Sequence, residues 1–103
     1  MANYVLAYSG GSVPETEEAG AAVMAAWTAW LSALGDAVVD RGAPFGPSAS
    51  VASDGAVSDG GSTHLSGYSI VKADSLSAAG TLVKDCPALS DGGTVDIYEA
   101  IEM

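Results

Sequence analysis

Very few side chains in this sequence are suited to catalysis at neutral pH, and His64 is the first of them. It is the only histidine, and imidazole has an ordinary pKa close to neutrality, so His64 is a candidate general base. A base of this kind needs an acid to orient it, which Asp36, Asp40 or Asp59 could supply. We take His64 and Asp36 as the candidate catalytic residues. The alternatives are an exposed loop histidine and an aspartate that serves only the turn it follows.

Four further residues have side chains suited to binding a small molecule. Arg41 is the only arginine, and its guanidinium could hold a carboxylate by two parallel hydrogen bonds. Tyr4, Tyr8 and Tyr68 lie on predicted strands, where each could offer an apolar ring with a polar tip to a pocket. The alternatives are a salt bridge for Arg41 and ordinary packing for the tyrosines.

The sequence predicts no metal and no cofactor. One histidine and one cysteine without ligand spacing cannot form a metal site. Gly10-Gly11 lacks the spacing of a phosphate-binding loop. Cys86 precedes Pro87 at the end of a predicted helix, away from positive charge, so a buried structural thiol is expected.

Composition and charge narrow the class of protein. The 103 residues suffice for one domain, and the net charge is −10, with Arg41, Lys72 and Lys84 as the only permanent cations. This balance argues against binding to nucleic acid or to an anionic membrane. We expect no membrane span and no signal peptide, since no apolar run is long enough and the start lacks a basic segment. With a single cysteine, the expected location is cytoplasmic.

A long amphipathic helix is predicted over Pro14–Leu34. Ser12 and Glu15 have the spacing of a capping box, and Gly35 follows as a helix terminator. The helix carries an apolar stripe at spacings of three and four. The residues of this stripe are Val23, Trp27, Trp30, Leu31 and Leu34.

The remaining segments predict strands and one shorter helix, Ser75–Asp85, with Asp74 as its N-cap. Asp54-Gly55 predicts a two-residue turn between two short strands, and hence a small protruding hairpin around residues 49–59. The resulting order is β-α-β-(hairpin)-β-α-β. It predicts an α+β, ferredoxin-like plait: a four-stranded antiparallel sheet with both helices on one face. The strands are expected at Asn3–Tyr8, Asp36–Gly42, Ser50–Ala52, Ala56–Ser58, Gly67–Ala73 and Thr94–Ile101.

The predicted first strand is apolar on both faces, with Tyr4, Leu6 and Tyr8 on one and Val5 and Ala7 on the other. Helices that cover one face leave the other exposed to water. A homodimer formed through the sheet faces would bury that surface, and so small a chain gains much from burying it.

Several short motifs resemble the YCII-related, DGPF-type family. The resemblance covers nearly the whole chain and includes the paired tryptophans and the turn at residues 42–44. It implies a single YCII-like ferredoxin-fold domain over residues 1–103 and a dimeric α+β barrel with a cleft between the sheets. Two features differ from the family: Trp27 lies where one branch carries a histidine, and the Pro-Phe pair after Asp59-Gly60 is absent. The motifs are Asp59-Gly60, Leu65-Ser66-Gly67-Tyr68, Ala73-Asp74-Ser75-Leu76, Lys84-Asp85-Cys86-Pro87 and Gly92-Gly93-Thr94-Val95.

Three functions follow as hypotheses. The first is binding of a small apolar or aromatic metabolite in the cleft between the sheets of the dimer. The second is a cofactor-independent lyase or isomerase on a hydroxylated aromatic, with His64 as base and Arg41 or a tyrosine stabilising the oxyanion. The third is a protein-interaction module that uses the hairpin or the acidic surface.

Overall fold

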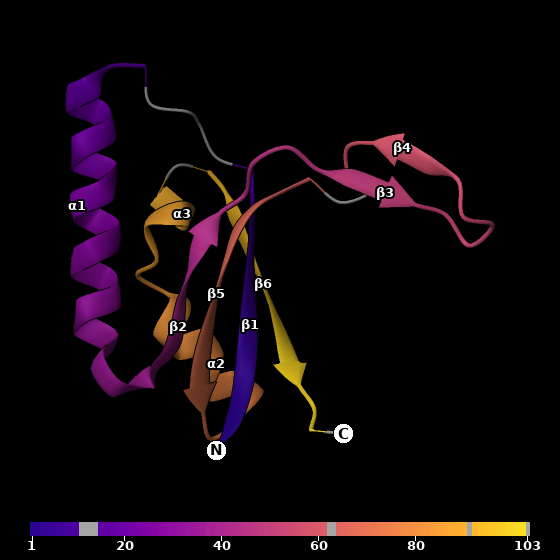
Figure 1. The fold of residues 1–103 in the computed structure, drawn as a ribbon. Coiled ribbons are helices and arrows are strands. Elements are labelled where there is room, and N and C mark those ends of the chain that lie inside the picture. The colour runs from indigo at the N-terminus through magenta and orange to yellow at the C-terminus, as the bar shows by residue number, and fades with distance from the viewer. Residues whose placement is uncertain (11–14, 62–63, 91, 103) are drawn as a thin grey trace.

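The computed structural model describes residues 1–10, 15–61, 64–90 and 92–102 and has an α+β fold. Its main sheet contains β1 (Ala2–Ser9), β2 (Val38–Pro44), β5 (Leu65–Ala73) and β6 (Thr94–Ala100). All neighbouring strands are antiparallel, in the order β2-β5-β1-β6 (Figure 1). The helices are α1 (Glu17–Leu34), α2 (Leu76–Val83) and α3 (Pro87–Ser90), and a 3-10 turn, Gly35–Ala37, joins α1 to β2.

The core lies between one face of this sheet and the helices. Alternate residues of a strand point to opposite faces, and on β1 the residues facing the helices are Tyr4, Leu6 and Tyr8. Leu6 is fully buried, as is Val71 on the neighbouring strand β5. Helices α1 and α2 cover this face with side chains that form one cluster: Trp30, Leu31, Ala79 and Val83.

Helix α1 begins later than the sequence predicts. Thr16 is its N-cap and accepts a hydrogen bond from the amide of Ala19 at 3.0 Å, which satisfies one of the free donors of the first turn. The predicted capping residue Ser12 and the predicted first residue Pro14 lie outside the described residues. The helix ends as predicted, because Gly35 adopts a φ of 55°.

Helix α1 contacts the core mainly through its C-terminal half. Trp30 and Leu31 are buried there, and the indole Nε1 of Trp30 donates to the carbonyl oxygen of Leu82 at 3.3 Å. Trp27 packs edge-on against both Tyr8 and Trp30, with ring centroids 4.9 and 5.7 Å away. The N-terminal half, which includes the exposed Met24, stands clear of the sheet (Figure 1).

The second predicted helix is divided in two. Ser75, and not Asp74, is the N-cap of α2, since its hydroxyl accepts from the amide of Ala78 at 3.0 Å. Helix α2 stops at Val83, and Pro87 opens the short helix α3, where proline's missing N–H costs nothing. Cys86 lies between the two helices and is buried.

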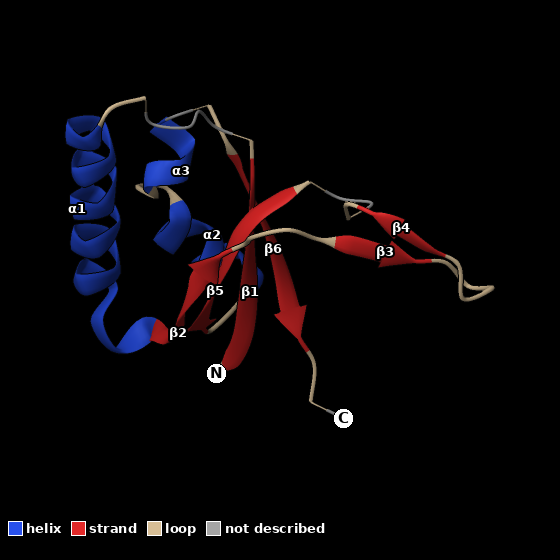
Figure 2. Cartoon of the chain, turned by 45° about the horizontal axis from the view of Figure 1, so that its top comes forward, coloured by secondary structure: helices blue, strands red, loops and turns tan. Residues whose placement is uncertain are grey.

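The remaining strands, β3 (Ala49–Val51) and β4 (Val57–Asp59), form a separate two-stranded sheet. This hairpin leaves the main sheet on the side opposite to the helices (Figure 2). At its root, Ser48 accepts hydrogen bonds from the amides of Gly60 and Gly61, at 2.8 and 2.9 Å.

Strand β2 bulges at Gly42, where its register with β5 shifts. The Gly42 amide donates to Oδ1 of Asp40 at 2.8 Å, and its φ is +76°. A Cβ atom on Gly42 would overlap the carbonyl group of Tyr68. Only glycine therefore allows β2 to approach β5 with this bulge.

Replacing Gly42 by alanine is expected to lower the free energy of unfolding by about 3 kcal/mol or more, because it adds a backbone clash to an unfavourable positive φ. Gly46→Ala is the matched control, since a Cβ there meets nothing within 4 Å. It should change stability by less than about 0.5 kcal/mol. Urea denaturation measures both, and equal stability of the two variants would contradict the bulge.

Candidate functional site

The face of the sheet that the helices leave uncovered is the candidate site, here called the open face. Residues paired directly across antiparallel strands share a face, so the register defines its rows. One row crosses the sheet through Ile70, Val5 and Tyr98, and the next through Tyr68, Ala7 and Asp96. Asp40 and Ala43 on β2 extend these rows at the other edge. An uncovered face of an antiparallel sheet is usually polar, and the centre of this one is apolar.

An aromatic pair marks the end of the open face nearest the hairpin. Phe45 and Tyr68 stack with ring centroids 5.7 Å apart and an interplanar angle of 19°. The Tyr68 hydroxyl donates to Oδ2 of Asp40 at 3.5 Å, while Oδ1 of the same carboxylate accepts from Gly42. The hydrogen bond from Gly42 thus helps to orient the Asp40 carboxylate towards the hydroxyl of Tyr68. Together these groups offer a flat apolar surface with an acceptor at its rim.

His64 lies at the root of the hairpin, close to this pair. It is exposed and lines an open hollow of about 450 Å³ together with Phe45, Pro47 and Leu65. Within the part of the chain that the structure describes, His64 has no hydrogen bond and no ion pair. The hollow adjoins the open face, because Phe45 lines the hollow and stacks on Tyr68 of the open face.

The predicted catalytic residues His64 and Asp36 are not brought together. Asp36 belongs to the 3-10 turn before Val38, which pairs with Val71 at one end of β5. His64 precedes Leu65, at the other end of that strand. At about 3.3 Å per residue, roughly 20 Å of strand separates the two ends.

The predicted ligand-binding tyrosines lie on two faces of the sheet. Tyr4 and Tyr8 are buried beneath the helices, whereas Tyr68 lies on the open face. They therefore line no common pocket, and the grouping of Tyr4 and Tyr8 with Tyr68 is wrong. Tyr4 reaches the sheet edge, where its hydroxyl donates to Oε1 of Glu99 at 3.4 Å. Burial raises the pKa of Tyr4, and the Glu99 carboxylate raises it further.

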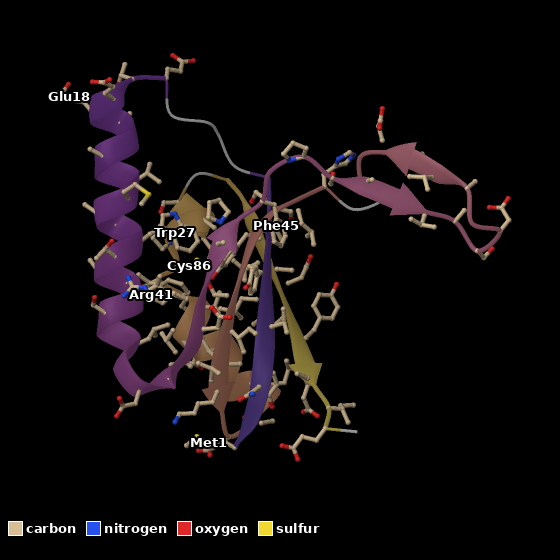
Figure 3. The ribbon with its side chains drawn as sticks, in the orientation of Figure 1. Met1, Glu18, Trp27, Arg41, Phe45 and Cys86 are labelled. Atoms are coloured by element: carbon tan, nitrogen blue, oxygen red, sulfur yellow. The ribbon has the colours of Figure 1, made fainter. Side chains whose placement is uncertain are left out.

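Arg41 also lies away from the open face. It follows Asp40 on β2, and its side chain extends on the α1 side of the strand (Figure 3). A carboxylate bound on the open face would be out of its reach. Its backbone has a structural contact, since the carbonyl oxygen of Arg41 accepts from the buried hydroxyl of Ser69 at 2.7 Å.

Tyr8 is the one buried side chain in the described residues whose polar atom has no hydrogen-bond partner. Its ring packs against Trp27, and the Ser69 hydroxyl and the Cys86 thiol are polar groups that influence its own hydroxyl. Burial raises the pKa of Tyr8 to about 12, an effect that the neighbouring Ser69 hydroxyl offsets only in part. Burial also raises the pKa of the Cys86 thiol. Neither group is therefore suited to act as a nucleophile. The burial of Cys86 agrees with its predicted structural role.

The described residues hold no group of three His, Cys, Asp or Glu side chains close enough to bind a metal ion. None of the described helices is sufficiently long and apolar to span a bilayer. Comparison with family models, with curated proteins and with solved structures gave no match.

Sequence reasoning did not select Phe45, Ile70 or Tyr98 as site residues. Ile70 and Tyr98 alternate with residues that face the helices, so strand periodicity pointed to a second apolar face without showing which side chains meet there. Phe45 stands between Pro44 and Gly46 in a segment predicted only to break the strand. The one signal that could have identified Phe45 as a site residue was the presence of an aromatic side chain in a turn.

Replacing Tyr8 by phenylalanine is expected to raise the free energy of unfolding by about 1 kcal/mol at pH 7.5, because it removes a buried hydroxyl without a partner. Because the folded state raises the pKa of Tyr8 above its ordinary value of 10.0, stability is intact below pH 10 and falls as the pH rises towards about 12. One such proton gives a slope of up to about 1.4 kcal/mol per pH unit. Urea denaturation at pH 7.5 and 11 should show a smaller alkaline loss in Tyr8→Phe.

Tyr4→Phe is the matched control, since Tyr4 is equally buried but its hydroxyl has a partner. It should cost about 0.5–1 kcal/mol at pH 7.5. A Tyr8→Phe variant less stable than the wild type at that pH would show that the hydroxyl has a partner in solution.

Proposed function

We propose that the protein is a homodimer that packs the open faces of its two sheets together and binds a small apolar or aromatic molecule between them. The observation that carries this proposal is the apolar centre of the open face, formed by Val5, Ile70 and Tyr98. The antiparallel order β2-β5-β1-β6 supports assignment to the ferredoxin-like plait. With that assignment, the sequence resemblance to the YCII-related family favours a dimeric α+β barrel.

The ligand site is placed at the Phe45–Tyr68 pair and the hollow beside it. A flat ring can stack on this pair, as aromatic groups prefer. The charges nearby are Asp40 and Asp96, and the row that continues the open face adds one cation, Lys72. A neutral ring with a hydrogen-bond donor fits these groups better than a carboxylate does, because Asp40 accepts and Arg41 points elsewhere.

The lyase or isomerase hypothesis places His64 as the base in the same hollow. A general base needs an orienting partner, and none of the described residues bonds to His64. Binding therefore has better support than turnover. The interaction-module hypothesis depends on the hairpin, whose apolar side chains favour contact with another apolar surface over contact with a basic one.

Tyr98→Asp is expected to convert the dimer to a monomer at micromolar concentration, since it places a charge in the apolar row of the paired sheet faces. Tyr98 is 60% exposed in the single chain, so the substitution should leave the fold intact. Light scattering coupled to gel filtration gives the mass, expected at twice 10.2 kDa for the wild type.

Met24→Asp is the matched control, because Met24 is 67% exposed but lies on α1, away from the open face. It should remain dimeric. A wild-type monomer, or a Tyr98→Asp variant that stays dimeric, would refute packing through the open face.

Phe45→Ala is expected to remove ligand stabilisation without preventing dimer formation. The probe is phenol at millimolar concentration, which should raise the melting temperature of the wild type by about 2 °C or more, as a ligand of the folded state does. Benzoate at the same concentration should raise it less. Leu89→Ala, with 42% exposure against 46% for Phe45, is the control and should keep the phenol effect. An equal shift in Phe45→Ala would rule out the stacking site.

A further inference from the structure

The β3–β4 hairpin is separate from the main sheet in the part of the chain that the structure describes. Its strands pair with each other and with no strand of the main sheet. Its tight turn is closed locally, by the amide of Gly55 donating to Ala52 and that of Ala56 donating to Asp54. An isolated two-stranded hairpin is at best marginally stable in water. The hairpin therefore gains by packing on another surface.

One face of the hairpin is suited to such packing. Val51 and Val57 are paired across the two strands, so their side chains share a face, and they are 68% and 70% exposed. Ser50 and Ser58 form the pair on the opposite face. The valine face also carries the pair Ala49 and Asp59, and Ser50 on the other face is half-buried, so the two valines are the main exposed apolar surface of the hairpin.

Hydrogen bonds close the hairpin at its root and join the segment just before it to β5. The Ser48 carbonyl and hydroxyl oxygens accept from Gly60 and Gly61, and the Phe45 amide donates to the carbonyl oxygen of Ser66 at 2.9 Å. In both orientations the hairpin projects from the main sheet on the side away from α1 (Figures 1 and 2). The hairpin and the open face therefore form the two sides of a corner, and the hollow lined by Phe45 and His64 lies at their junction.

The chain exposes more surface than a compact monomer does. Its accessible area is 6941 Å², whereas a monomer of 10.2 kDa is expected to expose about 5,300 Å². The radius of gyration is 15.0 Å, against about 13 Å expected for this length. The excess of about 1,600 Å² is larger than the roughly 800 Å² that each partner buries in a standard interface.

We propose that the β3–β4 hairpin is an arm that packs its Val51–Val57 face on the second copy of the chain, an inference that rests on the proposed dimer. A copy seated on the open face would occupy the corner and lie against the hairpin. In a two-fold dimer each copy both gives and receives an arm, so both valine pairs become buried when the dimer forms. The arm also closes one end of the cleft, beside Phe45 and His64. Asp54, Asp59 and the net charge of −10 disfavour a nucleic acid or an anionic membrane as the occupant.

The test replaces both valines by threonine, Val51→Thr with Val57→Thr, and measures the dimer dissociation constant by sedimentation equilibrium. Threonine keeps the size and strand preference of valine but adds a hydroxyl that resists burial. We expect the dissociation constant to rise at least tenfold. The control variant, Ser50→Thr with Ser58→Thr, changes the other face of the same hairpin and should leave the constant within about twofold.

Amide hydrogen exchange of residues 49–59 gives a second readout, measured above and below the concentration at which the dimer forms. Protection that increases on dimerisation supports the arm. The arm would be overturned if dimerisation left the exchange unchanged and the threonine variant kept the wild-type dissociation constant. If Tyr98→Asp still made the chain monomeric, the proposed function would stand. A weaker dimer in the threonine variant with no effect of Tyr98→Asp would support the arm and overturn packing through the open face.

Discussion

Strand β1 is apolar on both faces, and the helices can cover only one of them. Leu6 and Tyr8 point into the core, while Val5 and Ala7 point the other way. The described residues form one long helix and two short ones, and α1 uses little more than the segment from Trp27 to Leu34 for packing. No further apolar helix is left for the second face among the described residues. The open face is thus a consequence of how few elements the chain has, and the proposed dimer follows from it.

The bulge at Gly42 links this sheet to the candidate site. The register of β2 shifts twice against β5, between Val38 and Asp40 and between Asp40 and Ala43. Asp40 therefore shares a row with Ile70, and its carboxylate reaches the hydroxyl of Tyr68. The same strand then continues to Phe45, which stacks on that tyrosine. The two register shifts in β2 therefore position both the acceptor and the aromatic surface of the site. A substitution that straightened β2 would disturb the fold and the site together.

Most elements could be predicted from the sequence, because each has a local cause. Aromatic and β-branched residues mark β1, alternation of apolar residues marks β6, Gly35 marks the end of α1, and Asp54-Gly55 marks the turn of the hairpin, where Gly55 has a φ of 91°. The grouping of the tyrosines failed because it depends on register. Tyr68 pairs with Ala7 and not with Tyr8, and a shift of one residue between two strands exchanges their faces.

Local sequence patterns also could not show which side chains of different elements lie close together. Asp36 and His64 are each close to β5 in the fold, but strand direction places them at opposite ends of it. The N-cap of α2 fell on Ser75 and not on Asp74, since both types cap helices equally well and only the backbone decides. Charge, by contrast, is a property of composition and holds whatever the register. With three cations in 103 residues, anything bound firmly on the open face must be held by apolar contact and by donation to Asp40. This requirement favours a neutral ring over an anionic ligand, and a second copy, whose net charge is also −10, must be held by apolar contact.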